Sequence, residues 1–432
     1  MTRVVIKPAE NLRGEVNAPP SKSYTHRMLI AALLSSGKTT IEKPLISDDT
    51  LATLEAVKAF GAEVKQKGEL WEVNGQPPPL KTPAGPVSCR ESGTTLRFMI
   101  PVSALALGNT TFVMGQSLSR RPIEPLLQSL KQLGVNTRYD AENPSVIIVH
   151  GGGIDGGETT LRGDISSQFI SGLLFACPHA KNDTKISLTK PVESKGYIEM
   201  TLDVLRKHSV KVRISEDFTQ IQVPSGQIYL PFEHKVPGDF SSAAYLLAAA
   251  AITSSKIRIH NLDYTSKQGD KAILEILRHA GLEVKIGEGF VEVSGELRDA
   301  INVDAGDIPD LVPACTAIAC YTSGVSQICN AGRLRYKESD RLAALYTEFR
   351  KMGAHIIMEE SGLIIKGPCK LHGAVIDPHN DHRIAMACAA AALGAEGDTV
   401  IINAECVGKS YPNFFRDLTV LGANIVDGEL NW

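Results

Sequence analysis

Two patterns that could bind phosphate lie close together in residues 19–40, PPSKSYTHRMLIAALLSSGKTT. Gly37-Lys38-Thr39 matches the end of a nucleotide-binding P-loop, which also needs a glycine five positions earlier and a place between a strand and a helix. Ala32 occupies that position, inside the helix-like run MLIAALL. Because GKTT follows a helix and leads into a strand, we interpret it as an ordinary helix-to-strand turn.

The segment Ser21-Lys22-Ser23 is the better anion-binding pattern. It begins a predicted helix, where free backbone N–H groups and the positive end of the helix dipole attract anions. Lys22 and Arg27 add two full charges near the same helix end. We therefore predict that this first half of the stretch binds a negatively charged group of a substrate.

A second glycine pattern, GGGIDGG, satisfies GxGxxG at Gly151, Gly153 and Gly156 after the strand-like run SVIIVH. A dinucleotide site needs a helix to begin there, so that its N-terminus meets the pyrophosphate. The following residues, ETTLRGD, do not start a helix. We therefore do not predict a dinucleotide site.

Polar and charged residues recur at later helix starts, although the formal net charge of the chain is only -3. Two cations about 8 Å apart repel by roughly 2 kcal/mol at an effective dielectric constant of about 20. Such grouping therefore predicts polyanionic ligands. The residues concerned are Arg97, Arg121, Ser166, Ser167, Gln168, Ser194, Tyr197, Asp310, Lys337, Glu338, Arg341, Arg383 and Lys409.

The sequence gives little support for disulfides, a metal site, secretion or a membrane span. The eight cysteines form no CxxC pair, and His379 and His382 stand without further ligand spacing, so we expect reduced thiols and no metal. The N-terminus lacks the apolar region of a signal peptide, and the run from Ala243 to Ile252 is half of the roughly 20 residues of a membrane span. We expect a cytoplasmic protein that binds neither membrane nor nucleic acid.

A six-fold repeat must position these residues. An amphipathic helical run, a small residue suited to a left-handed cap and a strand-like run recur with gaps of 69 to 75 residues. The cap positions are Gly61, Gly134, Ser209, Gly281, Gly353 and Gly422. Each repeat also has an earlier Ala- and Leu-rich helix. These helices open with the capping clusters SKSYTHR, ESGTTLR, DISSQF, GDFSSA, DIPD and NDHR.

The length and the linkers predict two lobes of three repeats each. Pro- and Gly-rich segments at 17–20 and 223–239 are the best linkers. They predict one lobe from residues 19–237 and another from residues 1–18 with 238–432, the N-terminal strand joining the C-terminal half. Two such lobes would place an active site in the cleft between them.

Together these motifs resemble one family closely, the 3-phosphoshikimate 1-carboxyvinyltransferases or EPSP synthases, from Val4 to the C-terminus. The resemblance implies an α/β enolpyruvyltransferase fold, an inverse α/β barrel with six βαβαββ-type units, three per lobe. It also implies transfer of the enolpyruvyl group of phosphoenolpyruvate to the 5-hydroxyl of shikimate 3-phosphate, with release of phosphate. This is a step of the shikimate pathway to chorismate and aromatic amino acids, and it needs no metal or organic cofactor.

The resemblance also implies residue roles. The expected ligands of shikimate 3-phosphate are Lys22, Ser23, Arg27, Ser166, Ser167, Gln168, Ser194, Tyr197, Asp310 and Lys337. The expected ligands of phosphoenolpyruvate are Lys22, Gly93, Thr94, Arg97, Arg121, Gln168, Arg341, Arg383 and Lys409. Addition and elimination through a tetrahedral intermediate require proton transfer. The expected catalytic groups are Lys22, Asp310 and Glu338, and which of them moves which proton is left open.

Two departures from the family pattern and two alternatives stand beside this interpretation. Arg333 occupies a place where the family commonly has Asn. Its side chain either adds charge to the phosphate subsite or turns to solvent. The second departure is ESGTTLR, which replaces the commoner NAGTAMR. One alternative is the related enzyme acting on UDP-N-acetylglucosamine, but the segment MGQSLSRRPIEP lacks the Cys usual there. The other is a non-catalytic anion-binding protein, which we would not expect to retain all three catalytic candidates. We expect a monomer with small-molecule partners.

Overall fold

The computed structural model describes residues 2–139 and 143–427. The chain divides into two compact units, Ser21–Val236 and Met1–Pro20 with Pro237–Trp432. We call the first the N-terminal lobe and the second the C-terminal lobe. Each is described by itself below.

The N-terminal lobe contains three four-stranded sheets with one strand order. In each sheet the first strand is parallel to the second, and the remaining pairs are antiparallel. The sheets are β14 (Glu233–Lys235), β3 (Lys38–Glu42), β5 (Leu70–Asn74), β4 (Glu63–Lys67); β6 (Val87–Ser88), β7 (Thr110–Val113), β9 (Val146–Val149), β8 (Thr137–Tyr139); and β10 (Gly157–Arg162), β11 (Thr184–Thr189), β13 (Gln220–Val223), β12 (Arg213–Ile214).

The C-terminal lobe has the same arrangement and includes two strands from the N-terminal segment of the chain. Strand β1 (Arg3–Ile6) inserts antiparallel between β23 and β24, and β2 (Arg13–Asn17) runs parallel to β15. The sheets are β22 (Val375–Ile376), β23 (Thr399–Ile402), β1, β24 (Ile425–Asp427); β2, β15 (Lys256–His260), β17 (Phe290–Gly295), β16 (Leu282–Gly287); and β18 (Asn302–Asp304), β19 (Gly324–Cys329), β21 (Gly362–Gly367), β20 (Ile356–Glu359).

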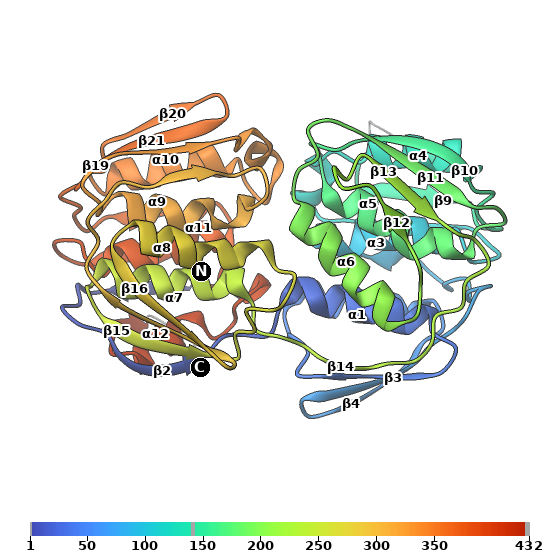
Figure 1. The fold of residues 1–432 in the computed structure, drawn as a ribbon, viewed down its shortest axis with the longest axis horizontal. Helices are drawn as coiled ribbons and strands as arrows, with labels where there is room; N and C mark the ends of the chain where they lie inside the picture. The colour runs from blue at the N-terminus through green and yellow to red at the C-terminus, as the bar shows by residue number, and fades with distance from the viewer. Residues whose placement is uncertain (1, 140–142, 428–432) are drawn as a thin grey trace. The chain divides into compact units, whose positions relative to one another are not determined.

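Each sheet belongs to a βαβαββ-type unit whose first helix lies in the core of its lobe. These helices are α1 (Lys22–Leu34), α3 (Gly93–Ser103), α5 (Ser167–Ala176), α7 (Phe240–Ile252), α9 (Val312–Ala319) and α11 (His382–Ala392). Every residue of α7, α9 and α11 is buried. Helices that are apolar on all sides must be surrounded by other elements. Figure 1 shows these helices inside each lobe and the sheets outside, which confirms the expected fold class.

The second helices of the units are amphipathic or short and end in the predicted caps. They are α2 (Asp48–Ala59), α4 (Glu124–Gln132), α6 (Lys195–Lys207), α8 (Ile273–His279), α10 (Arg341–Lys351) and α12 (Phe414–Val420). The six cap residues all have φ between 64° and 107°. At Gly134, for example, Val135 N donates to Leu130 O at 2.9 Å, which closes the helix end. The predicted period is confirmed, with Ser209 in the conformation that glycine adopts elsewhere.

Five of the six predicted opening clusters cap the core helices with a side chain. The capping residues are Ser21, Ser92, Ser166, Asp239 and Asp381. The sixth, DIPD, is an exception. It forms the 3-10 turn η4 (Pro309–Leu311), and the cap positions of η4 and α9 are occupied by the apolar residues Ile308 and Leu311. Asp310 is bound to arginines.

The two glycine-containing patterns that resemble nucleotide-binding motifs, GKTT and GGGIDGG, both have the structure expected from the sequence. Helix α1 ends at Leu34 and β3 begins at Lys38, so GKTT is a helix-to-strand turn. Strand β9 leads through GGGIDGG into β10, another strand. Among the described helices, none is long and apolar enough to cross a membrane. Seven of the eight cysteines are buried, as expected of small hydrophobic residues, whereas Cys329 is exposed.

Candidate functional site

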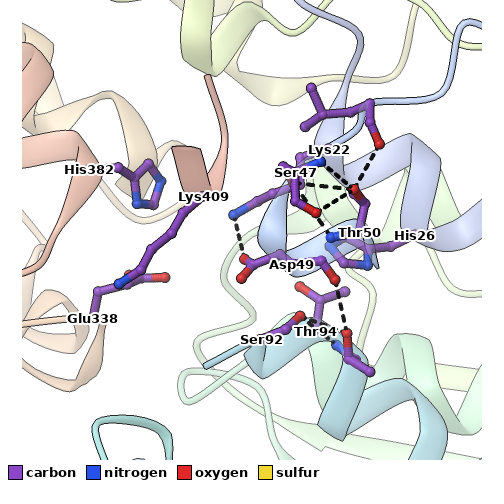
Figure 2. A network of polar contacts seen from close by, with 12 residues as sticks. Lys22, His26, Ser47, Asp49, Thr50, Ser92, Thr94, Glu338, His382 and Lys409 are labelled. Carbon is purple, nitrogen blue, oxygen red and sulfur yellow. Dashed lines mark hydrogen bonds and ion pairs between the residues drawn. The ribbon is translucent and has the colours of Figure 1, made fainter. Parts of the chain in front are cut away.

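Lys22 is the first residue of α1 and is held by an ion pair within the N-terminal lobe. Its Nζ lies 3.0 Å from Oδ2 of Asp49, in the first turn of α2 (Figure 2). Sequence reasoning missed Asp49, because one of two adjacent acidic residues at a helix start is usually explained by the helix dipole. The ion pair fixes the direction of the Lys22 side chain.

The backbone of Asp49 is itself anchored. Its carbonyl lies 3.3 Å from the hydroxyl donor Thr95 Oγ1, which is also in hydrogen-bonding contact with Ser92 Oγ at 2.7 Å. Ser47 caps α2 through a capping box with Thr50, as Figure 2 shows. The starts of α2 and α3 are thus joined by hydroxyl groups behind Lys22.

Arg27 is buried one turn further along α1 and joins α1 to α6. Its Nε donates to Thr201 Oγ1 at 2.8 Å, Nη1 to the carbonyl of Ser23 at 2.9 Å and Nη2 to the carbonyl of Tyr197 at 2.9 Å. The guanidinium also lies over the ring of Phe98. Burial lowers the pKa of Arg27 to about 10, so it is still charged at neutral pH. These bonds hold Ser23 and Tyr197 in fixed positions.

Three predicted serines lie at the N-termini of α5 and α6. Ser166 Oγ accepts a hydrogen bond from Gln168 N at 3.3 Å, and Ser167 begins the helix. Ser194 precedes α6 with φ 57° and ψ 40°, a left-handed conformation that costs a residue with a side chain roughly 1–3 kcal/mol. Both helix ends carry backbone N–H groups without helical partners, which suits an oxyanion.

Two further arginines converge at the start of α3, beside Gly93. A Cβ atom added to Gly93 would lie 3.2 Å from Nη1 of Arg97 and 3.3 Å from Nη1 of Arg121. Arg97 Nη1 donates to Gln168 Oε1 at 2.7 Å, and Gln168 Nε2 donates to Thr94 Oγ1 at 2.9 Å. The structure therefore brings together residues from three different helices or turns. Two guanidinium groups so close to one glycine favour an anion there.

The predicted residues of the C-terminal lobe are organised around Arg341, the first residue of α10. Its side chain is 1% exposed and forms ion pairs with Asp310 at 2.9 Å, with Glu338, and with Asp381 at 2.8 Å. Burial alone would lower the pKa of Arg341, but the three carboxylates, Asp381 most strongly, raise it. Sequence reasoning named Asp381 only as part of a helix cap. It accepts from Arg383 N as that cap and also binds Arg341, 40 residues away.

Asp310 is shared between two arginines. Besides Arg341, it binds Arg383, whose Nη2 lies 3.0 Å from Oδ2 and whose Nη1 donates to the carbonyl of Asp310 at 3.2 Å. Lys337 Nζ is 4.0 Å from Oδ1 of the same carboxylate. Removal from water lowers the pKa of Lys337 to about 8, with help from Arg341 and Arg333 and against the attraction of Asp310.

The remaining predicted cations have identifiable neighbours. Lys409, at the end of η6 (Ala404–Lys409), donates to the carbonyl of Asn380 at 2.7 Å; Figure 2 labels it with Glu338 and His382. Arg333, in η5 (Gly332–Tyr336), is half-buried and donates to the carbonyl of Gly306. It therefore does not turn fully to solvent, and its charge acts on Lys337.

The N-terminal lobe thus presents cations and hydroxyl groups at the starts of its helices, with Asp49 beside Lys22, and the C-terminal lobe presents cations paired with several carboxylates. Such a set can bind small polyanions and exchange protons with them. Among the described residues, no group of three or more His, Cys, Asp or Glu side chains is arranged to hold a metal ion.

Comparisons with known proteins give one consistent result. The family model of EPSP synthase (3-phosphoshikimate 1-carboxyvinyltransferase) matches residues 6–418. The 3-phosphoshikimate 1-carboxyvinyltransferase of Methanocella arvoryzae is 46% identical over 418 residues, covering 95% of this chain and 97% of the relative. That of Methanocaldococcus jannaschii is 42% identical, covering 98% and 99%. A solved EPSP synthase structure from Acinetobacter baumannii matches with a TM-score of 0.83 at 25% identity, covering 99% of this chain and all of that one.

Proposed function

The chain belongs to the EPSP synthase family, and from this premise we propose that the residue clusters described above bind the two substrates and move the protons of its reaction. The protein transfers the enolpyruvyl group of phosphoenolpyruvate to the 5-hydroxyl of shikimate 3-phosphate and releases phosphate. The alternative enolpyruvyltransferase, acting on UDP-N-acetylglucosamine, is not favoured, because relatives matched over nearly their whole length carry the shikimate enzyme's name.

For shikimate 3-phosphate, we assign the hydroxyl-rich helix starts of the N-terminal lobe. Ser166, Ser167 and Ser194 would bind its 3-phosphate, since two helix N-termini supply N–H groups beside them. Ser23 and Arg27 would lie at its carboxylate, with Gln168 and Tyr197 lining the pocket. In the C-terminal lobe, Lys337 would contact the phosphate and Asp310 the sugar-like ring.

For phosphoenolpyruvate, we assign the convergent cations. Lys22, Arg121 and Lys409 would bind its phosphate, while Arg341 and Arg383 would bind its carboxylate. Gly93, Thr94, Arg97 and Gln168 would shape the same subsite, because Gly93 leaves the two neighbouring guanidinium groups accessible to a ligand. Arginine is suited to this role since its planar fork pairs with carboxylate or phosphate through two hydrogen bonds.

The reaction depends on proton transfer. The 5-hydroxyl must lose a proton as its oxygen attacks C2 of phosphoenolpyruvate, and the methylene carbon must gain one. The tetrahedral adduct then loses a proton from the new methyl group and expels phosphate. We assign Asp310 as the base for the hydroxyl, because its carboxylate is held in place by two arginines. Glu338 and Lys22 are the candidates for proton exchange with carbon.

The observation that carries these assignments is the sharing of Asp310 between Arg341 and Arg383. One carboxylate is fixed between the two guanidinium groups assigned to the substrate carboxylate, which puts a base beside an anion subsite. Cationic groups around the adduct would stabilise the negative charge that develops on it.

The direct test is phosphate release from phosphoenolpyruvate by purified protein with shikimate 3-phosphate, in the presence of EDTA. We expect release that requires both substrates and is unchanged by the chelator. Tight binding of shikimate 3-phosphate without release would instead support the non-catalytic alternative. In that case, Arg333→Asn would be the first variant to examine for restored activity, since Arg333 is the departure nearest to Lys337.

A further inference from the structure

Two cysteines of the C-terminal lobe meet where the end of α9 contacts the end of β21. Cys320 directly follows α9, and Cys369 follows β21 by two residues. The N–H of Cys369 donates to the carbonyl of Cys320 at 2.7 Å. Gly367 packs on the same helix end, since a Cβ on it would lie 2.7 Å from the carbonyl oxygen of Ala319. Figure 1 shows α9 and β21 in the same part of this lobe.

This backbone hydrogen bond limits the separation of the two cysteines. With standard bond lengths, Cα atoms joined through one N–H···O=C bond of this length lie at most roughly 7 Å apart. Disulfides span Cα separations of roughly 4.4–6.8 Å. The two thiols are close enough for each to shift the pKa of the other. A disulfide could therefore form here with little movement of the backbone.

The two thiols have different environments. Cys369 Sγ accepts the N–H of His355 at 3.4 Å, and its S–H donates to the carbonyl of Lys366 at 3.3 Å. Cys369 retains 6% exposure, whereas Cys320 is fully buried. Interaction with Cys320, assisted by His355, outweighs burial and lowers the pKa of Cys369 to about 6. The same contact and burial raise the pKa of Cys320. Cys369 is thus suited to attack as a thiolate, and Cys320 to act as the second thiol.

We propose that Cys320 and Cys369 are an oxidation site at which a hydroperoxide produces an intramolecular disulfide. The Cys369 thiolate attacks one oxygen of hydrogen peroxide and breaks the O–O bond, which gives a sulfenic acid and a hydroxide that is protonated to water. The Cys320 sulfur then attacks the Cys369 sulfur, and the sulfenic oxygen leaves as a second water with the Cys320 proton. The two cysteines lose two electrons in total, and the peroxide is reduced to two waters.

The disulfide would cross-link the two ends of the segment that contains Lys337, Glu338 and Arg341. These residues lie between Cys320 and Cys369, so the disulfide closes a loop around them. A cross-link of this kind restricts the unfolded chain and stabilises the folded one. The oxidised protein should therefore unfold at a higher temperature than the reduced protein.

The test is mild oxidation of the reduced full-length protein with hydrogen peroxide, followed by alkylation and peptide mapping without reductant. We expect one linked pair of peptides containing residues 320 and 369, a mass loss of two hydrogens, reversal by dithiothreitol, and a higher thermal midpoint. Iodoacetamide should label Cys369 of the reduced protein with a half-maximal rate near pH 6.

Matched variants identify the sites. Cys369→Ser and Cys320→Ala should each abolish the linked peptide and the rise in thermal midpoint, whereas Cys329→Ser, at the exposed cysteine, should leave both intact. Oxidation of Cys369 to sulfinic acid with Cys320 unmodified would overturn the proposal, as would a linked peptide that lacks residue 320. Both of these outcomes are read in the unaltered protein and do not depend on the folding of a variant.

Discussion

The two lobes share one fold but compensate the charges of their clusters differently. In the N-terminal lobe, Arg27 and Arg97 donate to neutral hydroxyl, amide and carbonyl oxygens, and Lys22 is paired with Asp49. In the C-terminal lobe, Arg341 alone binds three carboxylates. Equivalent helix starts therefore carry arginines bonded to neutral oxygen atoms in one lobe and a network of carboxylate and cation pairs in the other.

Under the function proposed above, this difference would separate substrate binding from proton transfer. Hydroxyl groups and helix N-termini can bind a phosphate without neutralising the nearby cations. Asp310, which we propose as a proton acceptor, is instead held between two arginines of the C-terminal lobe. Lys22, for which we propose both roles, is positioned by a carboxylate of its own lobe.

The largest expected effect is on turnover. Lys22→Ala should lower kcat by about 10²- to 10⁴-fold, the usual contribution of an acid or base at a reacting centre. Lys38→Ala, in the turn that resembles a P-loop, should change kcat by less than about twofold, because Lys38 is 58% exposed and 3.6 Å from Glu72. Steady-state phosphate release would measure both. Equal losses in the two variants would refute our choice between the two phosphate motifs.

The next effect concerns the free energy of unfolding, and it tests whether the charge pairs of the C-terminal lobe stabilise that lobe. Arg341→Met should lower the free energy of unfolding by about 3–5 kcal/mol, because Asp381 is fully buried and would lose its cation. Arg121→Met, in the N-terminal cluster, should cost only about 1 kcal/mol. Urea unfolding followed by circular dichroism gives both values. If the two losses were the same, the lobes would not differ as we describe.

A smaller effect is expected at the glycine beside two arginines. Gly93→Ala should raise KM for phosphoenolpyruvate about tenfold with a lesser change in kcat, since the new methyl group displaces Arg97 and Arg121 by a few tenths of an ångström. Gly85→Ala is the matched control, because open space surrounds the position of its Cβ. An unchanged KM in Gly93→Ala would contradict the assignment of phosphoenolpyruvate to this subsite.

The last effect is a pH dependence in the C-terminal lobe, which is small near neutral pH. The pKa of Lys337 is lowered to about 8, so its ammonium is charged at pH 7 and loses its charge as pH rises through 8. The Kd for shikimate 3-phosphate should therefore rise above pH 8, by up to about tenfold per pH unit. Lys337→Arg should remove this dependence, because arginine stays charged. Calorimetric titration from pH 7 to pH 9.5 measures it, and parallel curves for the two proteins would contradict the assignment.

Much of the fold was predictable because its signals are local. The left-handed caps, the Ala-rich core helices and five of the six capping clusters each depend on residues within a few positions of one another. The same locality made it possible to reject the P-loop, since MLIAALL precedes GKTT. The exception, DIPD, shows the limit of this reasoning: Asp310 is bound by distant arginines and does not cap its helix.

By itself, then, the sequence determined the repeating unit, the positions of the helix starts and the types of residue placed there. Only the tertiary structure decided which carboxylate binds which cation. Lys22 meets Asp49 27 residues away, and Arg341 meets Asp381 40 residues away. Helical and strand periodicity extends over a few residues, whereas such pairs depend on how separate helices pack in the core of each lobe, and on the requirement that buried charges find partners there.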